Sequence, residues 1–176
     1  MQTVEAPHVM FTARRAGFTL IELLIVVAII GILAALTAPF LMAAKASANE
    51  ASAVSSLRVL NSAQTAFSTA CGSGGYSTSL TLLVSERFAS ADIDITPRSG
   101  YGFALAPGAG STPGPNDCTG AVTRTRYYFS AEPLSANHGT VGLATTQAGV
   151  IWQDTAGAAP MEPFAAAGTV SPYTGE

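Results

Sequence analysis

A run of 22 residues without a charged side chain, from Leu23 to Ala44, constrains the fold of this chain more than any other feature. Only Thr37 and Pro39 interrupt its apolar character. A helix rises ~1.5 Å per residue, so this run is long enough to cross a hydrocarbon core ~30 Å thick. A secretory signal peptide has a shorter apolar core and ends at a small-residue cleavage site, whereas here helix-forming sequence follows. We therefore predict a transmembrane helix that stays with the protein.

The charges on either side of this run indicate its orientation. Arg14 and Arg15 directly precede it, and Lys45 is the basic residue that follows it. Because positive charge favours the cytoplasmic side of a membrane, the N-terminus is expected inside the cell and residues 46–176 outside.

The rest of the composition argues against a nucleic-acid binder. Hydrophobic residues make up 48% of the chain and charged residues 11%. Six basic and ten acidic side chains follow residue 17, which gives that part a net charge of −4. Such a balance offers no basic surface for a phosphate backbone.

The two cysteines, Cys71 and Cys118, both lie in the part expected outside the membrane. They could be two buried free thiols or one disulfide. An exported domain favours the disulfide, because disulfides persist in oxidising compartments.

Glu22 is an anomaly, since it lies between Phe18-Thr-Leu-Ile and the apolar run. A carboxylate near the centre of a membrane helix costs at least ~2.5 kcal/mol and usually marks a function. The alternative is a residue that marks the start of the helix at the cytoplasmic interface, where water and the helix dipole satisfy it. The residue alone leaves both interpretations open.

The segment GFTLIELLIVVAIIGILAA, from Gly17 to Ala35, resembles the N-terminal processing and methylation signal of type IV prepilins and type II secretion pseudopilins. Basic residues, a glycine, a phenylalanine, a glutamate four residues later and an apolar helix rarely occur together elsewhere. The resemblance is strong over residues 14–40, moderate over 47–67, where it favours pilins, and only suggestive afterwards.

The resemblance implies that a prepilin peptidase cuts between Gly17 and Phe18 and then methylates the new amine of Phe18. Residues 1–17 would be a removed leader, and a start at Met10 would shorten that leader to eight residues. The new ammonium could offset the Glu22 carboxylate, within one subunit or between neighbours, and so set the register of assembly.

Two weak points interrupt the helix interior, Gly31 and Pro39. A proline removes a backbone donor and bends a helix. In the resembling family, the corresponding segment can lose helicity on assembly. An ordinary transmembrane kink is the alternative.

The predicted fold is α+β, with one long helix packed on an antiparallel sheet of three or four strands. The membrane half of the helix covers residues 18–44 and its amphipathic half covers 45–71, where apolar residues recur at three- and four-residue spacing. A head is expected over 72–154, with a short helix around Leu80–Phe88, and a flexible tail over 155–176. The helical stripe comprises Val54, Leu57, Leu60, Ala63, Phe67 and Cys71. The predicted strands are Ser99–Leu105, Arg124–Ala131, Thr140–Thr145 and Val150–Gln153, with a loop over Ala106–Gly120 and a tight turn over Gln147–Gly149.

No arrangement typical of an enzyme or a metal site stands out, so neither a catalytic residue, a metal, a cofactor nor a small-molecule substrate is predicted. The polar residues considered for such roles, and interpreted instead as leader, turn or solvated surface, are His8, His138, Asp92, Asp94, Asp154, Glu162, Arg124 and Arg126.

The resemblance implies a filament subunit of a type IV pilus, with a secretion pseudopilin as the alternative. Such a subunit would wait in the inner membrane and polymerise with itself or with homologous pilins. It would depend on a prepilin peptidase, an assembly ATPase and an inner-membrane platform, and end in an extracellular pilus or periplasmic pseudopilus. A minor priming subunit and a membrane-anchored binding domain are the remaining alternatives; the former often lacks the glutamate, and the latter leaves Gly17, Phe18 and Glu22 unexplained.

Overall fold

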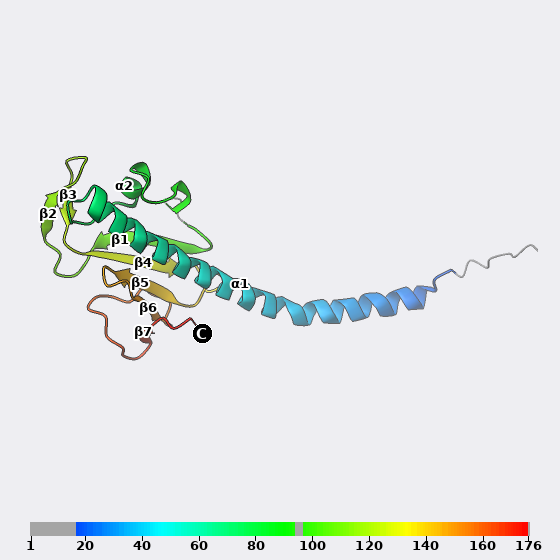
Figure 1. Cartoon of the computed structure of the whole chain (residues 1–176). Coiled ribbons are helices and arrows are strands. Elements are labelled where there is room, and N and C mark those ends of the chain that lie inside the picture. The colour runs from blue at the N-terminus through cyan, green and yellow to red at the C-terminus, as the bar shows by residue number, and fades with distance from the viewer. Residues whose placement is uncertain (1–16, 94–96, 176) are drawn as a thin grey trace, which may run out of the picture. The chain divides into compact units, whose positions relative to one another are not determined.

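The computed structural model describes residues 17–93 and 97–175. The expectations for His8, Met10, the two leader arginines and Asp94 lie outside these ranges. The chain divides into two compact units, Met1–Pro39 and Phe40–Glu176. A single long helix, α1 (Leu20–Ala70), contributes residues to both units (Figure 1).

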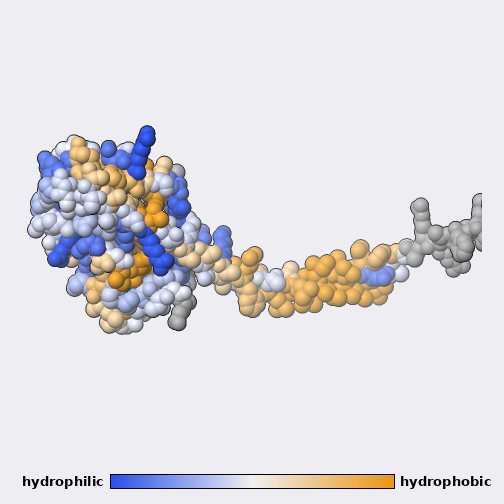
Figure 2. Space-filling model, viewed as in Figure 1, coloured by the Kyte–Doolittle hydropathy of each residue, from blue (hydrophilic) through white to orange (hydrophobic). Residues whose placement is uncertain are grey.

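In the first unit, α1 exposes apolar side chains on every side, and Figure 2 shows this surface as almost uniformly hydrophobic. The helix is long and apolar enough to cross a membrane, and none of its most apolar stretch is buried inside the protein. A helix that is apolar all round needs an apolar surrounding. This unit is therefore consistent with membrane anchoring.

In the second unit, α1 lies against a five-stranded antiparallel sheet with the order β1-β4-β5-β6-β7 (Figure 1). The expected α+β arrangement is confirmed, but the main sheet has five strands instead of three or four. Its strands are β1 (Tyr101–Pro107), β4 (Tyr127–Pro133), β5 (Gly142–Thr146), β6 (Ile151–Asp154) and β7 (Val170–Pro172). The expected short helix is present as α2 (Leu80–Ser85), followed by a 3-10 turn, η1 (Ala91–Ile93).

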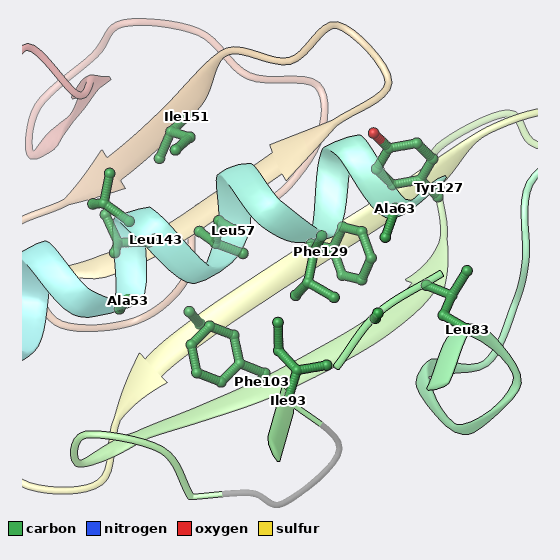
Figure 3. Close-up of a cluster of buried hydrophobic side chains, with 14 of the residues drawn as sticks. Ala53, Leu57, Ala63, Leu83, Ile93, Phe103, Tyr127, Phe129, Leu143 and Ile151 are labelled. Carbon is green, nitrogen blue, oxygen red and sulfur yellow. The ribbon is translucent and has the colours of Figure 1, made fainter. Parts of the chain in front are cut away.

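The core forms where the apolar stripe of α1 meets the inner face of the sheet (Figure 3). All six predicted stripe residues are buried. In β4, Tyr127, Phe129 and Ala131 are also buried and alternate with less buried neighbours, as expected for a strand with one face toward a core. Leu57 and Phe129 are fully buried.

Polar side chains on the packed face of α1 hold the helix against the sheet and against the segment that follows the helix. The amide of Gln64 donates to the Ser77 carbonyl at 2.9 Å and accepts from the Ser77 N–H at 2.9 Å. Asn61 donates to the Thr145 hydroxyl at 3.0 Å and accepts from the Tyr127 hydroxyl at 3.1 Å. These pairs require one rotation of α1, because any other would leave buried polar groups unsatisfied.

The disulfide between Cys71 and Cys118 is present, with their Cα atoms 4.9 Å apart. It joins the end of α1 to the region expected to be an uninterrupted loop, which instead contains β2 (Pro113–Asn116) paired with β3 (Val122–Arg124). The sequence did not predict β2 because the segment is rich in proline. A proline has no N–H to donate and is confined to edge strands.

The C-terminal stretch also differs from expectation. The sequence predicts a flexible tail from residue 155, whereas β7 pairs with β6 at the edge of the sheet. Phe164 stacks on Trp152 with the ring centres 5.4 Å apart. Gly142 permits the backbone of Ala158 to cross β5, since a side chain at this position would overlap the Ala158 carbonyl. Contacts with the sheet, not local propensity, hold this segment.

The packing of α1 on the sheet gives a stability test. We expect Leu57→Ala to lower the free energy of unfolding by ~2–5 kcal/mol, because Leu57 is fully buried and its truncation leaves a cavity. Leu134→Ala is the matched control; Leu134 is 58% exposed, so its loss should change stability by less than ~0.5 kcal/mol. Urea unfolding of the full chain in neutral detergent, followed by Trp152 fluorescence, measures both. Equal losses in the two variants would contradict the assigned core.

Candidate functional site

The first turn of α1 holds Glu22 through a reciprocal hydrogen-bonded pair with Thr19. The Glu22 N–H donates to the Thr19 hydroxyl at 3.2 Å. In return, the Glu22 carboxylate accepts from the Thr19 N–H at 3.5 Å and from the Thr19 hydroxyl at 3.4 Å. This is a capping box, in which the residue before the helix and the third helical residue satisfy each other's backbone N–H groups. The sequence carries the signature of this cap, Thr-x-x-Glu, directly before the apolar run.

The capping box supports the interpretation of Glu22 as a helix-start residue, but it leaves the charge of the carboxylate without a counter-ion. Among residues 17–93 and 97–175, no basic group lies within 4 Å of Glu22. The partner Thr19 is neutral, and two of its three contacts are longer than ordinary hydrogen bonds. A carboxylate held this way can still accept a cation.

Among the residues that the structure describes, close packing does not explain why this unit has glycines at positions 17 and 31. A side chain at Gly17 or Gly31 would meet nothing within 4 Å. Pro39 lies inside the helix, which continues through it. Their predicted roles, in cleavage and in helix softening, therefore concern other molecules or other states and stay predictions.

Among the polar residues interpreted as turn or solvated surface, Asp154 and Glu162 line the same groove. Asp92 pairs with Arg98 at 2.6 Å, and His138 contacts the Ser135 hydroxyl at 2.8 Å. Arg124 ends β3 and Arg126 follows it outside any strand, so the predicted strand Arg124–Ala131 is divided between β3 and β4. Within the described ranges, no three histidine, cysteine or acidic side chains lie close enough to hold a metal ion.

Sequence reasoning gave no role to Glu50, which lies in α1 on the head. Burial raises the pKa of its carboxyl group. The hydroxyl of nearby Tyr101 donates to the Val141 carbonyl at 2.9 Å. Burial first, and then the negative charge of Glu50, raise the pKa of Tyr101 to about 12. The charge on Glu50 therefore opposes folding at neutral pH.

The capping box gives the first test of this site. We expect Thr19→Val to speed amide hydrogen exchange at Glu22 and Leu23, whose N–H groups donate to Thr19, about fivefold, because losing an N-cap hydroxyl costs ~1 kcal/mol of helix stability. Thr19→Ser retains the hydroxyl and should exchange like the wild type. Nuclear magnetic resonance of the chain in micelles measures these rates. Equal exchange in all three proteins would contradict the cap.

The raised pKa of Glu50 predicts a pH dependence. The folded state holds the Glu50 proton more tightly than the unfolded state, so stability falls as pH rises from the ordinary value of about 4.3 through the raised value. We expect Glu50→Gln to have the higher Tm at pH 7 and a Tm equal to the wild type at pH 3.5, where Glu50 is neutral in both states. A constant difference at all pH values would exclude titration of Glu50 as the cause.

Comparison with known proteins finds similarity over the segment that contains this site. Residues 12–38 match the model of the prokaryotic N-terminal methylation motif. A segment of 57 residues is 49% identical to the type IV major pilin protein PilA of Myxococcus xanthus (strain DK1622). This match covers 32% of the chain and 26% of the Myxococcus protein. No solved structure matches the chain. By sequence, the chain is therefore similar to the N-terminal methylation motif over the segment that contains Glu22, and to a type IV pilin over part of its length.

Proposed function

We propose that this chain is a non-catalytic structural subunit of a type IV pilus-like filament, which it enters through α1 after cleavage between Gly17 and Phe18. The observation that carries the proposal is the Glu22 carboxylate in the first turn of the apolar, exposed half of α1, where no basic group of the described residues lies within 4 Å of it. The similarity to a protein named as a major pilin supports the same function.

Cleavage would create the missing counter-ion. A peptide nitrogen at Phe18 carries no charge, whereas the freed amine is a cation, and methylation preserves that charge. The next residue, Thr19, already donates its N–H to the Glu22 carboxylate, so the new cation forms close to that carboxylate. The pair can close within one chain or between an incoming subunit and its neighbour.

A charge pair between neighbours would set the axial register of the filament. In an apolar medium, removing one member of an ion pair typically costs ~3–5 kcal/mol. Stacking that leaves Glu22 opposite an apolar side chain is therefore disfavoured. Softening of α1 between Gly31 and Pro39 would let the helix adapt as it enters the filament.

The proposed route needs partners of known kinds. The precursor would wait in the inner membrane, with its N-terminus in the cytoplasm and its head in the periplasm. A prepilin peptidase would process and methylate it, and an assembly ATPase with its membrane platform would extract it into an extracellular pilus.

A pseudopilin of a type II secretion system shares the same processing and charge pairing. The similarity to a major pilin favours the pilus. Recovery of the chain in long fibres sheared from the cell surface supports the pilus, whereas loss of exoprotein release on deletion, with surface fibres intact, supports the pseudopilin.

Variants at Glu22 separate the charge from the cap. We expect Glu22→Ala and Glu22→Gln to be inserted and processed normally, and to lower the yield of sheared filaments at least about tenfold, because both lose the charge. Glutamine can still accept the Thr19 hydrogen bonds, so a role limited to capping would leave the Gln variant normal. Immunoblots of sheared and cell-bound fractions give the yield, and mass spectrometry gives the processed N-terminus.

Glu86→Gln, in an exposed position of the head, is the control for the change in net charge and should assemble normally. Normal fibre yield from both Glu22 variants would contradict the register role. An intact leader on the mature wild-type protein, with the chains dispersed as monomers, would contradict the whole proposal.

A further inference from the structure

The outer face of the main sheet carries an open groove of about 790 Å³. It lies on the face away from α1, because its residues in β4 (Tyr128, Ser130 and Glu132) alternate with the residues that pack in the core. The segment from Ala158 to Glu162 forms another wall, and Asp154 of β6 also lines the groove.

Three carboxylates and no basic side chain line this groove. Backbone N–H groups hold each of them: Ala159 donates to Glu132 at 3.0 Å, Ala156 donates to Asp154 at 2.8 Å, and Ala109 donates to Glu162. In the part of the chain that the structure describes, no basic group lies within 4 Å of any of the three. The groove therefore presents three fixed carboxylates without an ion-paired basic group among the described residues, and the nearby Arg126, which donates to the Ala109 carbonyl at 3.2 Å, lies on the side of Glu162.

Tyr128 gives the groove an aromatic wall. Its hydroxyl donates to the Pro160 carbonyl at 2.7 Å, which fixes the ring. Burial first, and then the negative charges of Glu132 and Glu162, raise the pKa of Tyr128 to about 12. Both carboxylates therefore act on the space around this one ring.

We propose that this groove binds a peptide segment that presents arginine or lysine side chains. A guanidinium or ammonium group entering the groove meets carboxylates that are already fixed and an aromatic ring, which are the two kinds of group that bind such cations. Nucleic acids and acidic surfaces would be repelled. This binding does not depend on polymerisation through α1.

The sole tryptophan of the chain, Trp152, reports on this site. It stacks on Phe164, which is two residues from Glu162 and also neighbours Tyr128, with ring centres 6.2 Å apart. The experiment titrates the full processed chain, in neutral-detergent micelles, with a tetra-arginine peptide. Trp152 fluorescence and calorimetry follow binding. A tetra-citrulline peptide, which has nearly the same shape but no charge, should bind at least about tenfold more weakly.

Variants locate the binding. Glutamine still accepts the N–H groups of Ala109 and Ala159, so the double variant Glu132→Gln/Glu162→Gln should keep the wild-type Tm and lose about tenfold in affinity. Glu86→Gln removes an acidic charge elsewhere on the head and should bind like the wild type.

Four results would overturn the proposal. They are absence of tetra-arginine binding, equal binding of tetra-citrulline, binding of tetra-glutamate, and an equal loss in Glu86→Gln and in the double variant. The comparison between peptides uses the wild-type chain and stands even where a variant fails to fold.

Discussion

A carboxylate on an otherwise apolar helix needs a partner, and this requirement governs the N-terminal unit. Thr19 supplies a neutral partner through the capping box, which satisfies hydrogen bonds but not charge. At a membrane interface, water would solvate the negative charge of the carboxylate. Water is absent from a hydrocarbon core or a dry helix bundle. Any state that takes the first turn of α1 out of water must therefore bring a cation to Glu22 or protonate it.

The head, in contrast, satisfies its polar groups internally. Asn61 of α1 finds its partners in β4 and β5, and Gln64 finds its partner in Ser77, in the segment that follows the helix. In the described part of the chain, no buried side-chain nitrogen or oxygen lacks a hydrogen bond. The amphipathic half of α1 thus belongs to a folded domain, whereas its apolar half relies on its surroundings. The two halves form one continuous helix, in which apolar residues lie on all sides at first and then on one face only.

The sequence predicted features whose signals are local and missed those that depend on distant contacts. The stripe from Val54 to Cys71 and the turn before β6 were predicted from the spacing and type of nearby residues. The disulfide was predicted from the expected location of both cysteines outside the membrane. Strand β2 was not predicted because prolines are depleted in strands and are tolerated only at edges. Strand β7 was not predicted because it lies in an alanine- and glycine-rich segment with low strand propensity. At the site, Glu22 was evident from its charge. Its partner Thr19 could have been predicted too, because Thr-x-x-Glu is the sequence signature of a capping box.

Apolar surface alone cannot specify how copies of such a helix align. The hydrophobic effect is non-directional, so sliding one apolar helix along another changes its free energy little. A directional group is needed to select one alignment, as a single polar residue does in the core of a coiled coil. Within residues 20–44 of α1, Glu22 is the one ionisable side chain. In the proposed filament, bulk attraction would come from the apolar residues, and the choice of register would come from this one carboxylate.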